Sequence, residues 1–285
     1  RGGVRRPFDW KGFVAIVLFM PLTIYALARG NSPANHEGWA SPTVIACFAV
    51  AAAAFAFFIV TELRNPAPLL QIRLLGERNF GVSMSVLTLF AVGMLGGTYL
   101  LPLYMQRGLD YTALMAGSVF LPVGLIQGVL SAVSGYMTRY VKPLLLVVAG
   151  ILVMALSFWL ASRFTLHTTH RHILFVLYLR GLGMGLTFAP LNLFSLKNLT
   201  QEDMAAAAGI SNSIKQLAGS FGIAILTAVL AARTAYHTAH ETLPEAQTYV
   251  EGVTDALSVV VWLTLASAVP LVWVLLKRKK RGKTG

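Results

Sequence analysis

The sequence predicts an all-α polytopic membrane protein with eight transmembrane helices. Of its 285 residues, 56% are hydrophobic and only 12% are charged, about half the charged share of a soluble domain. A helix needs roughly 20 apolar residues to cross a bilayer core, and the apolar runs reach that length repeatedly. The predicted spans are 12–28, 42–61, 80–104, 113–137, 143–161, 172–196, 205–232 and 255–276.

Lys and Arg are distributed unequally between alternate loops. The connections on one side of the membrane, together with the C-terminal tail, hold 16 of the 23 basic residues. The connections on the other side hold 5, and Arg180 and Lys215 lie inside spans. Because cytoplasmic loops accumulate Lys and Arg, both ends of this segment are predicted to be cytoplasmic. The cluster at 277–281 follows the last span directly and is expected to meet anionic lipid. The net charge of +12 therefore does not indicate nucleic-acid binding.

The eight spans differ in polarity. The spans 12–28, 42–61, 143–161 and 255–276 are almost bare of polar groups and are expected to shield the others from lipid. The other four carry polar side chains, which at membrane depth face the protein interior or a wet cavity. Six of these side chains are the candidates for lining a substrate cavity: Tyr99, Gln127, Arg180, Asn192, Asn212 and Gln216.

One spacing of glycine and proline occurs twice, three spans apart. An odd number of spans reverses direction across the membrane, so the repetition indicates an inverted repeat of three plus three helices, as in many secondary transporters. Small residues let helices approach closely and prolines kink them. The candidates for helix packing or gating are Gly93, Gly97 and Pro102 in one copy and Gly181, Gly185 and Pro190 in the other.

Two basic residues inside spans have competing interpretations. Arg180 is either a cavity cation that contacts substrate or modulates proton release, or a structural partner for Asp110 or Asp255. Lys215 is favoured to make hydrogen bonds between helices or to extend toward the inner surface.

Histidines fall on the predicted outer side or its boundary. The pairs His167/His170 and His237/His240 have a spacing that a helix would bring together, but they lack a third metal ligand. A surface sensitive to pH is favoured over a metal site, and solvated loop histidines are the default. The segment 233–254 is predicted to be the longest outer connection. It is favoured as a plain connector over a docking surface.

The sequence offers no phosphate-binding loop, metalloprotease motif or nucleophile elbow, so no enzyme activity, metal or cofactor is predicted. All eleven acidic residues lie in loops or at span ends. A proton-coupled transporter needs an ionisable group buried in the membrane. Proton coupling is therefore expected in another part of the protein, or not at all. The chain also opens on a basic, glycine-containing stretch without an initiator Met, which suggests a fragment.

An ordered series of motifs resembles the fourteen-span drug:proton antiporters of the major facilitator superfamily (EmrB/QacA type). Phe8-Asp9-Trp10-Lys11-Gly12 opens a span, and Arg78-Asn79-Phe80 precedes the third. Further matches are Tyr111-Thr112-Ala113 with Ala116-Gly117, Arg180-Gly181-Leu182-Gly183, and the run from Asn212 to Ala224. Two features depart from the family: the loop 135–143 keeps only Gly135 of the superfamily's gating motif, and Lys215 stands where many relatives have Arg.

The resemblance implies a domain organisation. Residues 1–79 would hold a cytoplasmic linker, the extra central helix pair and a cytoplasmic loop. Residues 80–276 would form the six-helix C-terminal bundle, and 277–285 a basic cytoplasmic tail. The six-helix N-terminal bundle of the same protein, with the proton-handling residues, would be the missing partner.

The resemblance also implies a multidrug efflux function linked to antibiotic resistance. The protein would export drugs or other amphipathic or hydrophobic compounds, with the proton gradient as energy source. The alternatives are a dedicated exporter of one metabolite, siderophore or lipid-like compound, or a non-transporting scaffold or sensor. Whether a periplasmic adaptor and an outer-membrane channel take part is left open by the sequence.

Overall fold

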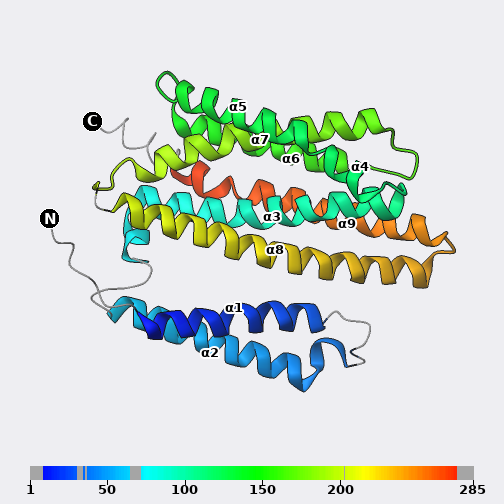
Figure 1. Cartoon of the computed structure of the whole chain (residues 1–285), viewed down its shortest axis with the longest axis horizontal. Coiled ribbons are helices and arrows are strands. Elements are labelled where there is room, and N and C mark those ends of the chain that lie inside the picture. Colours follow the sequence, from blue (N-terminus) through cyan, green and yellow to red (C-terminus); the bar gives the residue numbers. More distant parts are fainter. Residues whose placement is uncertain (1–8, 31–34, 36, 65–71, 202, 275–285) are drawn as a thin grey trace. The chain divides into compact units, whose positions relative to one another are not determined.

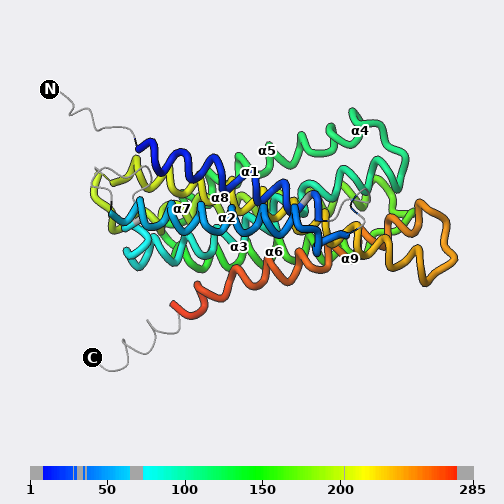
Figure 2. Tube along the Cα trace, turned by 90° about the horizontal axis from the view of Figure 1, so that it is seen from below, coloured from blue at the N-terminus to red at the C-terminus, as the bar shows by residue number. Residues whose placement is uncertain are grey.

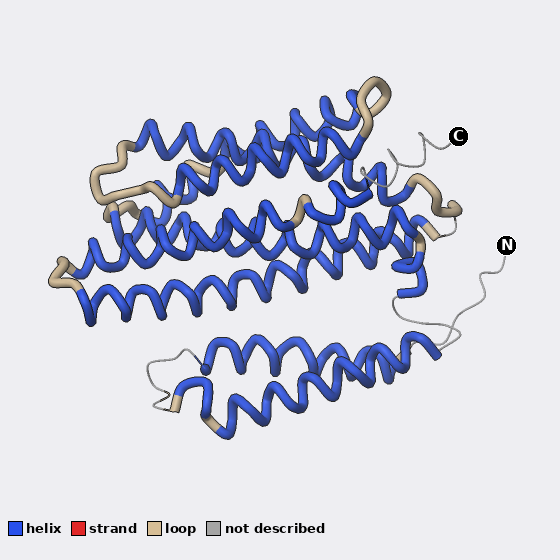
Figure 3. The backbone as a smooth tube through the Cα atoms, turned by 180° about the vertical axis from the view of Figure 1, so that it is seen from behind, coloured by secondary structure: helices blue, strands red, loops and turns tan. Residues whose placement is uncertain are grey.

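The computed structural model describes residues 9–30, 35, 37–64, 72–201 and 203–274. These residues form helices joined by turns and loops, with no strand in the described ranges (Figure 3). Eight candidate spans in this part of the chain are long and apolar enough to cross a membrane, which confirms the predicted fold class. The basic cluster at 277–281 lies outside the described residues.

The chain divides into two compact units. One comprises Arg1–Glu77 with Leu199–Ser213, and the other comprises Arg78–Asn198 with Ile214–Gly285. Each unit is described by itself. The expected organisation into 1–79, 80–276 and 277–285 stays a prediction.

The first unit contains the antiparallel helix pair α1 (Trp10–Gly30) and α2 (Pro42–Arg64), shown in Figure 1. The 3-10 turns η1 (Gly38–Ala40) and η2 (Ile72–Gly76) precede and follow α2. Small buried residues along the pair, including Ala15, Ala26 and Ala51, let the two helices approach, and Phe19 packs on Phe55 with ring centroids 4.8 Å apart.

Asp9 and Gly12 of the Phe-Asp-x-x-Gly motif lie at the N-terminus of α1, while Phe8 is outside the described residues. The carboxylate Oδ1 of Asp9 accepts the backbone N–H of Gly12 at 3.0 Å, which satisfies one of the donors that a helix start leaves free. A Cβ on residue 12 would lie 2.6 Å from Asp9 Oδ2, so glycine gives the carboxylate room. The motif therefore acts here as a helix cap.

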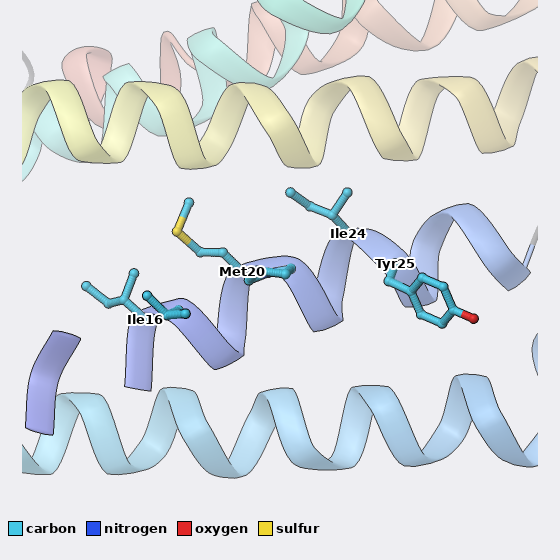
Figure 4. Close-up of a pocket in the computed structure, with 6 residues that line it drawn as sticks. Ile16, Met20, Ile24 and Tyr25 are labelled. Carbon is cyan, nitrogen blue, oxygen red and sulfur yellow. The ribbon is translucent and has the colours of Figure 1, made fainter. Parts of the chain in front are cut away.

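The face of α1 shown in Figure 4 carries an apolar groove. Two rows of residues spaced four apart line it, and Ile16, Met20 and Ile24 project away from α2 in this view. Pro21 lies among them and removes one backbone donor from the helix. The complete lining is Ile16, Val17, Met20, Pro21, Ile24 and Tyr25, which includes none of the six predicted cavity residues.

The second unit is built around α3 (Arg78–Gly108), α6 (Pro143–Ala161) and α7 (His170–Leu196). Within the most apolar 18-residue stretch of each of these three spans, 50 to 56% of the residues are buried. The corresponding share in the span 113–137 is 17%. Large side chains from all three helices fill the core, among them Phe90, Phe158 and Leu177. Because α3 and α7 run in opposite directions (Figure 1), they satisfy one requirement of the inverted repeat.

The fourth predicted span is two helices instead of one. A turn at 119–120 separates α4 (Ala113–Ser118) from α5 (Leu121–Met137). Pro122 stands at the start of α5, where its missing N–H is tolerated, but its ring disfavours continuation of α4. The last span is also interrupted, because α9 (Glu245–Ala266) is followed by a turn at 267–268 before helix resumes at 269–274 (Figure 3).

The segment 233–254 is mostly helix, so its prediction as a long connection is wrong. Helix α8 (Met204–His240) has 37 residues, and α9 begins at Glu245 after a connection of 241–244 (Figure 2). A Cβ on Gly252 would lie 2.3 Å from the hydroxyl of Thr234, which shows how closely the two helices pack here. Tertiary packing keeps these polar residues helical beyond the apolar part of the spans.

Candidate functional site

Arg180 lies in the interior of the second unit, with only 1% of its surface exposed. Its Nη2 donates to the carbonyl oxygen of Met94 at 3.0 Å and to the hydroxyl of Thr98, both on α3. Its guanidinium lies over the ring of Phe158 on α6, 5.0 Å from the ring centroid. One side chain on α7 thus joins three helices, through hydrogen bonds and a cation–π contact.

The two carboxylates proposed as partners for Arg180 lie elsewhere, so that interpretation is wrong. Asp255 binds Arg233 and His237, and Asp110 is exposed in the connection after α3. Nη1 of Arg180 has no hydrogen-bond partner among the described residues. A cation buried without a carboxylate is costly, because its removal from water is only partly repaid by carbonyl, hydroxyl and ring contacts.

The glycines after Arg180 face two different helices. A Cβ on Gly181 would lie 2.9 Å from the carbonyl oxygen of Val123 on α5, and one on Gly185 would lie 2.7 Å from Cβ of Leu130. A Cβ on Gly183 would instead lie 2.9 Å from the backbone nitrogen of Met154 on α6. Gly-x-Gly-x-Gly therefore lets α7 contact both neighbours at backbone distance.

A buried hydrogen bond accompanies the contact between α5 and α7. The hydroxyl of Ser134 donates to the carbonyl oxygen of Gly185 at 2.7 Å, and Ser134 is fully buried. On the other side of α7, Ser157 of α6 donates to the carbonyl oxygen of Val176 at 2.8 Å. Serine hydroxyls thus bridge the helices at sites that small residues have opened.

The glycines of the first copy of the repeat also mark helix contacts. A Cβ on Gly93 would lie 3.0 Å from the hydroxyl oxygen of Thr264 on α9. A Cβ on Gly97 would lie 2.3 Å from Cε1 of Phe158 on α6. Pro102 and Pro190 lie inside α3 and α7. The two copies use their glycines against different neighbours, and a gating role for any of the six residues stays a prediction.

The other predicted cavity residues lie toward helix surfaces. Tyr99 on α3 is 43% exposed, Asn192 on α7 and Gln216 on α8 are exposed, and Gln127 on α5 is half-buried. Asn212 is exposed and belongs to the segment grouped with the first unit. Among the described residues, no hydrogen bond, ion pair or ring contact joins two of these side chains, so their assembly into a cavity stays a prediction.

A cluster of four charged or titratable side chains joins the end of α8 to α9. Arg233 Nε lies 2.6 Å from Asp255 Oδ2, and His237 Nε2 lies 2.9 Å from the same oxygen. His237 Nδ1 lies 3.0 Å from Glu241 Oε1. The sequence prediction missed this cluster, although the four-residue spacing from Arg233 to His237 to Glu241 is a helical signal that could have found three members.

Histidines of the two spaced pairs contact other groups. His240 stacks on Tyr236 with ring centroids 4.3 Å apart, while His237 binds the carboxylates. His170 Nδ1 lies 3.1 Å from the Tyr111 hydroxyl. Within the described residues, no group of three or more His, Cys, Asp or Glu side chains could hold a metal ion.

Fold and site together define a polytopic membrane protein in which polar side chains gather on a subset of tightly packed helices. Comparison with known proteins specifies its class, because a model of the Major Facilitator Superfamily matches residues 10–223. The chain belongs to this superfamily of transporters.

Several relatives are drug-efflux and resistance proteins. Puromycin resistance protein pur8 of Streptomyces alboniger is 32% identical over 272 residues, which cover 93% of this chain and 52% of that protein. Multidrug export protein EmrB of Escherichia coli (strain K12) is 30% identical over 239 residues, 84% of this chain and 46% of that protein. Fatty acid resistance protein FarB of Neisseria gonorrhoeae is 28% identical over 234 residues, 82% and 46% respectively.

These matches confirm the resemblance to drug-efflux members of the superfamily. The chain spans about half the length of the curated relatives it matches.

Proposed function

We propose that this chain is the C-terminal part of a proton-coupled antiporter that exports drugs or other amphipathic compounds across the bacterial inner membrane. The observation that carries the proposal is the exposure of Tyr99, Asn192 and Gln216 on three spans of one helical unit. Polar side chains at membrane depth require a protein or aqueous environment, because lipid offers them no partners. A substrate path along these helices supplies that environment.

The rest of the transporter would cover the least buried helices of the unit. Gly124 and Gly128 on α5 have open space where a Cβ would stand, and their four-residue spacing is typical of helix-packing faces. The relatives are about twice as long as the aligned region, which leaves room for another helical bundle. We therefore assign the open face of α5 to contact with that bundle.

The transport of protons across the membrane is assigned to residues outside the second unit. Asp9 caps α1, and Glu62 is buried two residues before the end of α2. Asp255 lies midway along α9, where the apolar run of that helix begins, and binds Arg233 and His237. A carrier of protons needs an ionisable group deeper in the membrane. The proton gradient supplies the energy in this proposal, and no cofactor is required.

The orientation follows from the unequal distribution of basic residues. With both ends of the segment in the cytoplasm, the end of α8 and the start of α9 face the outer side. The relatives' names include multidrug export, puromycin resistance and fatty acid resistance, which supports amphipathic or hydrophobic substrates.

Transport by everted membrane vesicles tests the proposal. Vesicles that contain the full-length protein should accumulate a fluorescent amphipathic cation only while a proton gradient exists, and a protonophore should abolish accumulation. Asn192→Ala and Gln216→Ala should each lower the rate several-fold. The matched controls Leu193→Ala and Ile225→Ala, at exposed apolar positions of the same helices, should not. If the protein causes no gradient-dependent accumulation, the scaffold or sensor alternative is supported.

A panel of unrelated substrates separates the multidrug exporter from a dedicated one. The relationship to a fatty acid resistance protein makes a long-chain fatty acid the appropriate lipid-like member of the panel. Puromycin and a cationic dye represent the other chemical classes. Protection against a single compound would favour the dedicated exporter.

A further inference from the structure

Both ring nitrogens of His237 face carboxylate oxygens. Nδ1 lies 3.0 Å from Glu241 Oε1, and Nε2 lies 2.9 Å from Asp255 Oδ2. An ionised carboxylate can only accept hydrogen bonds, and a neutral imidazole carries one N–H and one bare lone pair. Two such contacts at once therefore require both ring nitrogens to be protonated.

We propose that His237 is a proton-binding site whose occupation ties the end of α8 to Glu241 and to Asp255 of α9. With the proton bound, two cations, Arg233 and His237, face two carboxylates. Without it, one ring nitrogen presents a lone pair to a carboxylate oxygen, and one contact must break. The site acts as a proton-dependent clamp on the hairpin formed by α8 and α9.

The surroundings of His237 contain no competing arrangement in the described part of the chain. On α8, Arg233 lies over the Tyr236 ring and binds Asp255, while His240 stacks on that same ring. On α9, Glu245 and Glu251 make no described contact with His237. On the two adjacent helices, Arg107 of α3 lies over the ring of Tyr249, and Glu245 of α9 is exposed.

Burial makes the clamp effective. The His237 side chain is 11% exposed, whereas those of Asp255 and Glu241 are 33% and 42% exposed. The imidazole is thus shielded while its carboxylates remain open to water, which gives protons a route to the site. On the predicted orientation this route opens to the outer side. The inference depends on that orientation for the side it senses, and not on drug export.

Thermal unfolding of the full-length protein at several pH values tests the clamp. The folded protein holds the proton, so the stabilisation is present at acidic pH and lost as pH rises through the titration of the site. His237→Gln should lower the unfolding midpoint by about 2–4 °C at pH 5.5 and leave it unchanged at pH 9. His240→Gln, the matched control one turn away, should match the original protein at both.

Two further variants keep the test decisive. His237→Arg carries a permanent charge with donors for both carboxylates, so its midpoint should stay high at pH 9. In a protein that already carries Asp255→Asn, adding His237→Gln should change the unfolding midpoint at pH 5.5 only slightly. An equal loss at both pH values, or no loss at pH 5.5, overturns the proposal. Transport plays no part in these measurements, so a failure of the export proposal would leave their outcome unchanged.

Discussion

Gly97 and Phe158 fit together so closely that a Cβ on Gly97 would lie 2.3 Å from Cε1 of the phenylalanine ring. The ring cannot readily move away, because Phe158 is fully buried and the guanidinium of Arg180 lies over its ring. This contact fixes the distance between α3 and α6 at the depth of the buried cation.

Gly97→Ala is therefore expected to destabilise the protein by about 1–3 kcal/mol, the usual cost of adding a methyl group to a tightly packed core. Thermal unfolding in detergent measures the change. Gly209→Ala on α8 is the matched control, because a Cβ at that position would meet no atom within 4 Å. Equal behaviour of the two variants would show that the close contact is absent in the protein.

Ser134→Ala tests the hydrogen bond between α5 and α7. Hydrogen bonds between membrane helices contribute about 0.6 kcal/mol on average, so the expected loss of stability is small. Gly185→Ala should cost more, because its Cβ would lie 2.7 Å from Leu130 Cβ. We therefore expect Gly185→Ala to lower the unfolding midpoint more than Ser134→Ala, because close approach of the two helices contributes more to stability than their hydrogen bond. The reverse order would contradict this ranking.

Arg180→Met separates structural from functional roles of the buried cation. Methionine fills much of the space without a charge, so the variant should be at least as stable as the original protein. Arg180→Ala should be less stable by about 2–4 kcal/mol, because it leaves a cavity beside Phe158. If Arg180 serves transport, the Met variant loses export while it retains its fold. A stable variant with full transport would exclude that role.

Asp9→Ala should weaken the start of α1 by about 1 kcal/mol, because it removes the acceptor for the Gly12 amide. Hydrogen exchange of the first turn of α1 measures this local effect, and Asp9→Ser should largely restore protection. Lys11→Ala, a change at an exposed neighbour, serves as the control. Unchanged exchange in Asp9→Ala would argue against the cap.

Hydropathy was sufficient to predict the eight spans, because lipid penalises polar groups along the whole length of a helix. It could not predict the helical residues from 233 to 240 and from 245 to 254, since helix that extends beyond the apolar core is stabilised by neighbouring helices. The break at 119–120 was also missed. Pro122 signals it, but proline is tolerated inside other helices here, such as Pro102 in α3.

The candidate site was predictable to a similar degree. Arg180 stood out because a cation inside an apolar run is rare. Its actual partners, a backbone carbonyl, a hydroxyl and a ring, leave no recognisable pattern in a sequence, so a distant carboxylate was the natural expectation. His237 was paired with His240 by spacing alone, whereas its position on α8 directs it to Asp255 on the adjacent helix.

The buried guanidinium of Arg180 is a charge inside a membrane-spanning helix, so any motion of this side chain along the membrane normal would depend on voltage. A full elementary charge that crosses a membrane held at 100 mV exchanges about 2.3 kcal/mol with the electric field. If Arg180 moved across a fifth of this potential, the free energy would change by about 0.5 kcal/mol. This corresponds to a little more than a twofold change in an equilibrium constant. Such a motion would couple the packing of α3, α6 and α7 to the membrane potential directly.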